Sequence, residues 1–123
     1  MNEKKSNIVK DKSFSFVLRV VKLYKFLVEN KEYILSKQLL FSGTAVGASD
    51  REAEHAESKS DFIHKMAIAQ KEANETEYWI ELLYQSEYLN ASQYNSIIID
   101  IQELNKILAS IIITSKGNKY GKR

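Results

Sequence analysis

The sequence predicts an all-α protein folded as an antiparallel, up-down-up-down four-helix bundle. The chain of 123 residues has no proline and only four glycines, whereas β-sandwiches and barrels need many turns that contain these two residues. Apolar residues recur at helical spacing in four successive segments. The connections between these segments are short, which favours antiparallel packing of successive helices.

The first helix is expected over residues 13–30, and it is unusually apolar. Between Phe14 and Val28, 11 of 15 residues are apolar. The polar residues of this stretch share one narrow stripe at helical spacing; they are Ser15, Arg19, Lys22 and Lys25. Because a surface helix of a monomer ordinarily has a limited apolar stripe and a wide polar face, we expect this helix to be buried on more than one side.

The second helix is expected over residues 32–56, and it contains two glycines four positions apart. Gly43 and Gly47 share one face of this helix. An interior glycine costs a helix about 1 kcal/mol relative to alanine, so the pair indicates close packing against a neighbouring helix. The alternative is a loop centred on these residues, but the small residues around them and the absence of proline favour a continuous helix.

The third helix is expected over residues 59–87. Ser58 followed by Asp61 is close to a capping box, which marks the start of a helix. Apolar residues then recur mostly at spacings of three and four as far as Leu83, with charged residues at the other positions. This pattern makes the third helix the clearest of the four.

The fourth helix is expected over residues 91–116, after a cap at Asn90 or Ser92. It carries an apolar seam with alternating spacings of four and three, which suits packing in a bundle. The seam consists of Ile97, Ile101, Leu104, Leu108 and Ile111. Gly117 is expected to end this helix as its C′ residue.

The composition excludes several classes of protein. Hydrophobic residues make up 44% of the chain and charged residues 28%, which is typical of one globular domain. Without cysteine there is no disulfide framework, thiolate nucleophile or cysteine-based metal site. The longest stretches without a charged residue have 12 residues, too few to span a bilayer, and no signal peptide is recognisable. We therefore expect a cytoplasmic protein with no membrane partner.

The small net charge of +2 conceals an uneven distribution. Residues 1–25 carry a net charge of +5 and residues 116–123 one of +4, which leaves −7 for the middle of the chain. In an antiparallel four-helix bundle both chain ends lie at the same end, so we expect a basic pole there. Its candidate nucleic-acid-binding residues are Lys4, Lys5, Lys10, Lys12, Lys116, Lys119, Lys122 and Arg123.

This pattern of charge and hydropathy divides the chain into three parts. Residues 1–12 are expected to form a flexible basic tail, residues 13–116 the four-helix bundle, and residues 117–123 a second basic tail. Charged tails also keep chain ends solvated without binding anything in particular, and this is the alternative to a nucleic-acid-binding pole.

Two short spacings are reminiscent of metal sites. Glu52 and His55 form a Glu-x-x-His pair, and Asp61 and His64 form its Asp counterpart. Di-iron bundles place such pairs in mid-bundle, with a further Glu from each of the other two helices. Here the pairs are expected to flank a turn, and the only acid of the first helix, Glu29, is expected at the opposite end. We therefore expect no metal site.

The remaining candidates for chemistry are aromatic. Tyr78, Trp79 and Tyr84 could stack on nucleobases, but we expect them to pack at helix interfaces. The sequence has no glycine-rich phosphate loop after a strand and no motif for a nucleophilic serine. We therefore expect no catalytic residues, no cofactor and no enzymatic activity.

Two stretches resemble a known family. Residues 39–55 read LLFSGTAVGASDREAEH, and residues 58–83 read SKSDFIHKMAIAQKEANETEYWIELL. Both resemble the bacterial four-helix-bundle family named after the 23S ribosomal RNA intervening sequences in which some members are encoded. The resemblance implies an antiparallel four-helix bundle that assembles as a homopentameric ring and has no established enzymatic activity. A more distant similarity, to the accessory protein of diversity-generating retroelements, implies the same pentameric barrel and binding of nucleic acid and a reverse transcriptase.

Two functions remain as hypotheses. The first is a non-enzymatic, homo-oligomeric accessory factor that binds RNA or DNA through the basic pole. The second is a structural or scaffold protein that acts through protein–protein contacts. The expected partners are further copies of the chain, RNA or DNA, and a reverse transcriptase.

Overall fold

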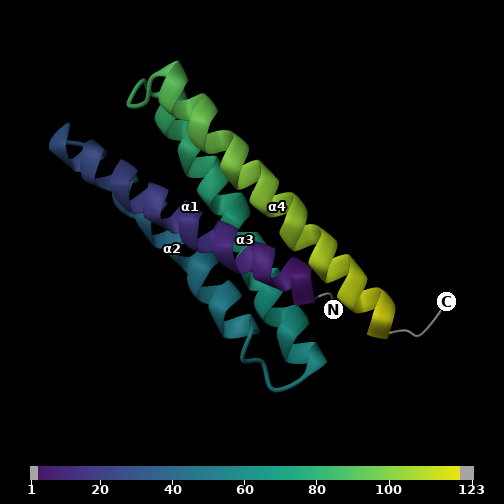
Figure 1. Cartoon of the computed structure of the whole chain (residues 1–123). Helices are drawn as coiled ribbons and strands as arrows, with labels where there is room; N and C mark the ends of the chain where they lie inside the picture. The colour runs from purple at the N-terminus through teal and green to yellow at the C-terminus, as the bar shows by residue number, and fades with distance from the viewer. Residues whose placement is uncertain (1–2, 120–123) are drawn as a thin grey trace.

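Four α-helices make up the fold. The computed structural model describes the backbone of residues 3–119 and the side chains of residues 8–117. Its helices are α1 (Glu3–Glu29), α2 (Leu35–Ala53), α3 (Lys59–Gln85) and α4 (Ala91–Lys119), and no strand occurs between residues 3 and 119. α1 and α3 each pack against both α2 and α4, so the helices surround one core (Figure 1). The predicted all-α class with four helices is confirmed.

α1 begins ten residues earlier than predicted. Residues 3–12, which were expected to form a flexible tail, are helical. Val9 is completely buried in this segment, and Lys12 Nζ lies 2.9 Å from Glu103 Oε1 of α4. The burial of Val9 and the ion pair with α4 help to hold the segment against the other helices, although its many charged residues hide it from the hydropathy pattern.

Residues other than glycine adopt the left-handed backbone conformation that closes α1 and α3. Lys31 has a φ of 66° and Glu87 a φ of 71°. After α1, the Lys31 N–H donates to the Val28 carbonyl and the Glu32 N–H donates to the Leu27 carbonyl, each at 2.9 Å. This is the Schellman pattern of a helix C-terminus. The hydrogen bonds after α3 repeat it, so both helices end without the glycine that usually marks such a site.

The carboxylate of Glu32 caps the start of α2. Its Oε2 accepts hydrogen bonds from the backbone N–H groups of Ile34 (3.2 Å) and Leu35 (3.0 Å), and its Oε1 accepts one from Ser36 (2.6 Å). The negative charge also lies at the positive end of the helix dipole. α2 therefore begins at Leu35 instead of residue 32, and it ends at Ala53, three residues before its predicted end.

The predicted caps of α3 and α4 are present. The Ser58 hydroxyl accepts a hydrogen bond from the Asp61 N–H at 3.0 Å. Asn90 and Gln93 exchange hydrogen bonds between side chain and backbone at 2.8 and 2.9 Å, which is a reciprocal cap. Both helices begin where predicted, and α3 ends two residues early. The prediction that Gly117 ends α4 is wrong, because α4 continues two residues beyond it.

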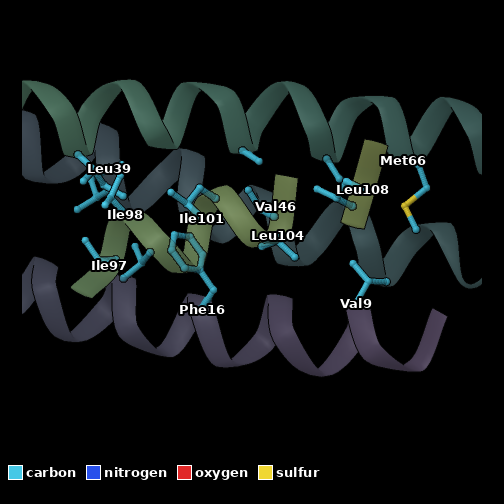
Figure 2. Packing of buried hydrophobic residues seen from close by; sticks show 14 of the residues in the cluster. Val9, Phe16, Leu39, Val46, Met66, Ile97, Ile98, Ile101, Leu104 and Leu108 are labelled. Carbon is cyan, nitrogen blue, oxygen red and sulfur yellow. The ribbon is translucent and has the colours of Figure 1, made fainter. Parts of the chain in front are cut away.

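The core is a cluster of mostly aliphatic side chains along the inside of the bundle. All members of the predicted α4 seam are 3% exposed or less. Figure 2 shows side chains from the four helices converging on this core; those labelled are Val9, Phe16, Leu39, Val46, Met66, Ile97, Ile98, Ile101, Leu104 and Leu108. Between residues 3 and 119, no helix is long and apolar enough to cross a membrane.

α1 and α2 approach each other closely at the two glycines of α2. A Cβ atom added to Gly43 would lie 2.8 Å from Val20 Cγ1, and one added to Gly47 would lie 2.8 Å from Val17 Cγ2. Both valines belong to α1, and their β-branched side chains have restricted rotamers in a helix, so they cannot easily move aside. Both glycines lie inside a continuous α2, which excludes the loop alternative.

Replacing Gly43 by leucine should force α1 away from α2. The new side chain would overpack the contact with Val20. Overpacking typically costs about 1–3 kcal/mol, whereas leucine gains less than about 1 kcal/mol over glycine as a helix former. We expect the free energy of unfolding of Gly43→Leu to fall by about 1–2 kcal/mol in urea denaturation followed by circular dichroism.

The control for this prediction is Gly117→Leu. Nothing lies within 4 Å of a Cβ atom at Gly117, so the same substitution should leave stability unchanged or slightly raise it. Equal effects of the two substitutions would contradict a close contact at Gly43.

Candidate functional site

The two ends of the described chain lie at the same end of the bundle. Figure 1 shows the start of α1 and the end of α4 there, together with the connection between α2 and α3 (residues 54–58). The described segments that carry predicted basic residues, residues 4–12 and 116–119, therefore come together. The side chains of five of these residues lie outside the described part of the chain: Lys4, Lys5, Lys119, Lys122 and Arg123.

Two of the three predicted basic residues with described side chains form ion pairs. Lys10 Nζ lies 3.9 Å from Glu54 Oε1, and Lys12 Nζ lies 2.9 Å from Glu103 Oε1. Partly exposed pairs of this kind contribute about 0–1 kcal/mol each, but they partly neutralise the two lysines. Lys116 is exposed on α4. In the described part of this end, Glu54 of the α2–α3 connection and Glu103 of α4 thus lie beside two of the three lysines.

His55 and His64 are both exposed near this end of the bundle. Glu52 and Asp61, the acidic residues of the two predicted metal-site pairs, contact other groups. Glu52 Oε1 lies 3.3 Å from Lys65 Nζ, and Asp61 Oδ2 accepts a hydrogen bond from the Glu57 N–H at 3.2 Å. Among the side chains of residues 8–117, no three His, Cys, Asp or Glu residues come together as metal ligands would.

The aromatic side chains of α3 lie in different environments. Trp79 packs partly buried against the core and donates from Nε1 to Glu75 Oε2 at 3.2 Å. Tyr84 stacks on Tyr94 of α4 with ring centroids 4.1 Å apart. Tyr78, by contrast, is 58% exposed. The prediction that it packs between helices is therefore wrong, and its ring is available to a partner.

One side of the α1–α2 pair exposes large apolar side chains. Phe14 and Leu18 of α1 are 53% and 56% exposed, and Phe41 of α2 is 62% exposed. Phe14 and Leu18 lie one turn apart on α1. Phe41 lies on the outward side of α2, one turn before Thr44, which lines a cavity together with Phe14. We call Phe14, Leu18 and Phe41 the α1–α2 apolar face. The first helix was expected to be buried on more than one side, and α1 packs against both α2 and α4. The side of α1 that carries Phe14 and Leu18 remains uncovered within one chain.

A shallow cavity of about 230 Å³ lies between the two helices of this face. Its apolar and small lining residues are Phe14, Val17, Thr44, Gly47 and Ala48. Val17 and Gly47, which pack closely against each other, both line it. Ser13, Asp50, Lys10 and Arg51 also line it, so the cavity combines apolar residues with one acidic and two basic residues.

A buried carboxylate lies beside the same helix contact. Asp50 of α2 is 1% exposed, and its Oδ2 accepts a hydrogen bond from the Ser13 hydroxyl of α1 at 3.1 Å. Its Oδ1 has no hydrogen-bond partner among the described residues. Burial raises the pKa of the Asp50 carboxyl from 3.8 to about 6, against the lowering effect of the Ser13 hydrogen bond. Asp50 was not predicted, although it lies seven and three positions after Gly43 and Gly47, on their helix face.

The fold defines the protein as a small all-α protein of four helices, and comparisons give its family. Residues 5–110 match the family described as 23S rRNA-intervening sequence protein. The chain belongs to this family, which confirms the resemblance seen in its sequence.

A solved structure agrees with this assignment. It is the crystal structure of a protein with unknown function from the S23 ribosomal protein family of Bacteroides thetaiotaomicron. The two chains share 60% sequence identity and superpose with a TM-score of 0.86, over 88% of this chain and 97% of that one. No curated protein matches the chain.

The raised pKa of Asp50 makes the stability of the protein depend on pH. Between pH 3.8 and about 6, the folded state retains a proton on Asp50 that the unfolded state has released. The free energy of unfolding therefore falls as the pH rises through this window. Glu54 adds to the effect by raising the pKa, whereas Arg51 and Lys10 oppose it by lowering the pKa.

Asp50→Asn should remove this pH dependence, because an amide does not ionise in this range. One pKa unit corresponds to about 1.4 kcal/mol. We expect the free energy of unfolding of Asp50→Asn, relative to the unsubstituted protein, to rise by about 2–3 kcal/mol between pH 4 and pH 7 in urea denaturation. If the difference in free energy of unfolding between the variant and the unsubstituted protein were the same at both pH values, the raised pKa of Asp50 would be contradicted.

Proposed function

We propose that the protein is a non-enzymatic scaffold that works as a homo-oligomer, a ring of five copies assembled through the α1–α2 apolar face. The observation that carries this proposal is the exposure of three large apolar side chains, Phe14, Leu18 and Phe41, on two neighbouring helices. Exposed apolar patches on soluble proteins mark interaction surfaces. A second copy of the chain then covers the side of α1 that one chain leaves open.

The charges around the face support a second copy as the partner. Arg51 flanks its cavity, whereas the exposed side of α3 carries Glu75 one turn before the exposed Tyr78. A contact between two different patches is heterologous, and such contacts close into a ring when the rotation between copies allows it. The number of five copies rests on the resemblance to the intervening-sequence family.

A charge placed in the apolar face should break the assembly. Phe14→Glu would bring a carboxylate into the contact with the next copy, and burying an unpaired charge is strongly unfavourable. We expect the unsubstituted protein to sediment as an oligomer at micromolar concentration in analytical ultracentrifugation. Phe14→Glu should instead sediment as the 14.2 kDa chain.

The matched control is Ser15→Glu. It adds the same charge at the adjacent position of α1, which is exposed and belongs to the polar stripe, so the oligomer should persist. The assembly proposal fails if the unsubstituted protein is a monomer at every concentration, or if both variants dissociate alike.

Nucleic-acid binding at the basic end is a second proposed function. It is favoured by the position of the start of α1 and the end of α4 at one end of the bundle, together with the exposed Lys116 (Figure 1). In a cyclic ring the copies are related by rotation, so their basic ends would lie on one rim and their charges would add. Contacts of this kind are made to phosphates, and they are therefore sequence-independent and sensitive to salt.

Reversing two charges at the basic end should weaken binding of RNA. We expect the unsubstituted full-length protein to bind a single-stranded RNA weakly and to lose affinity steeply between about 50 and 200 mM salt. In a fluorescence anisotropy titration, Lys5→Glu/Lys116→Glu should lose most of this affinity. The control Lys31→Glu/Lys37→Glu, at the opposite end of the bundle, should keep it. Equal affinity of the two double variants, or affinity independent of salt, would rule out the basic end as the binding surface.

A further inference from the structure

A second cavity, of about 440 Å³, lies between α1 and α4. It is formed by the second half of α1 and the first turns of α4, so it lies toward the end of the bundle opposite to the chain termini. Figure 1 shows α1 and α4 diverging toward this end. Leu23, Phe26 and Ile97 form the apolar part of the cavity, and Arg19, Lys22 and Ser96 are among its polar groups.

The guanidinium of Arg19 is held in place at this cavity. Its Nη1 donates to the Ser96 carbonyl at 3.2 Å and to the Asp100 carboxylate, and its Nη2 donates to the Ser96 hydroxyl at 2.6 Å. These hydrogen bonds hold the planar guanidinium of Arg19 against α4, and the Asp100 carboxylate balances its positive charge. The Ser96 hydroxyl, which accepts from Arg19, still carries its own hydrogen as a donor.

Lys22 gives the cavity its unbalanced positive charge. It lies one turn after Arg19 on α1 and lines the same cavity, and its side chain is exposed. An ammonium at the mouth of a partly apolar cavity attracts an anion whose uncharged part can enter. The cavity volume is within the range of sites for single small molecules, and it is too small for a peptide helix of several turns.

We propose that this cavity binds a nucleoside phosphate. The base packs against Leu23, Phe26 and Ile97, because a flat aromatic ring fits an apolar pocket with an aromatic side chain. The phosphate lies at Lys22, within reach of the donors of Arg19 and Ser96. The ligand is either a free nucleotide or the terminal nucleotide of a nucleic-acid strand. This site does not depend on the oligomer or on the basic end, which lies at the other end of the bundle.

The test is isothermal titration calorimetry of the full-length protein with adenosine monophosphate as the probe. We expect the nucleotide to bind at least about tenfold more tightly than either adenosine or inorganic phosphate, because each lacks one half of the recognised chemistry. Lys22→Ala should weaken nucleotide binding by about tenfold. The control Lys25→Ala removes the next exposed lysine of α1, which does not line the cavity, and it should bind the nucleotide as the unsubstituted protein does.

Two further measurements complete the test. Amide chemical shifts on nucleotide addition should change around Phe26 and Ile97. A 5′-phosphorylated oligonucleotide that binds more tightly than the nucleotide, with the same loss in Lys22→Ala, identifies a strand end as the ligand, and weaker binding identifies the free nucleotide.

Three results would overturn the proposal. They are nucleotide binding no tighter than phosphate binding, equal losses in the two lysine variants, and shift changes confined to the basic end around Lys116. Binding of an acidic peptide in the absence of any nucleotide binding would overturn it as well.

Discussion

The close contact between α1 and α2 is the constraint on which the other features of the structure depend. Gly43 and Gly47 let two valines of α1 reach the backbone of α2, and the hydrogen bond between Ser13 and Asp50 joins the same two helices one turn further along. The outward side of α1 carries Phe14 and Leu18, and the adjacent outward side of α2 carries Phe41, so this contact brings the two parts of the α1–α2 apolar face together. The same placement lets α1 diverge from α4 toward the α1–α2 connection, where the larger cavity lies.

The three surfaces described here lie on different parts of the bundle. The α1–α2 apolar face runs along one side, the basic end includes the start of α1 and the end of α4, and the α1–α4 cavity lies toward the opposite end. Lys10 belongs to the basic end and also lines the cavity of the apolar face, whereas Lys116 does not line that cavity. Assembly through the apolar face would therefore leave Lys116 free. A ring that repeats one weak phosphate-binding end around its rim gains affinity by multivalency, without any additional contact within a single copy.

Local signals in the sequence predicted the parts of the fold that local interactions determine. α3 and α4 begin where predicted because Ser58 and Asn90 cap them with hydrogen bonds to residues three positions away. The start of α1 was missed because it depends on the burial of Val9 between distant helices and on an ion pair with α4. The same limit applies to the site. The position of Lys10 at the basic end follows from topology, but its pairing with Glu54, just after the end of α2, depends on helix register. Asp50 had a detectable signal, since its spacing from the glycines places it on the buried face.

The central claim is that a second copy covers the outward side of α1. Hydroxyl-radical footprinting of the full-length protein across a range of concentrations tests it most directly. We expect Phe14, Leu18 and Phe41 to become protected as the concentration rises, whereas Tyr88, exposed in the α3–α4 connection, should keep its reactivity. Unchanged reactivity of Phe14 and Phe41 at every concentration would contradict the claim.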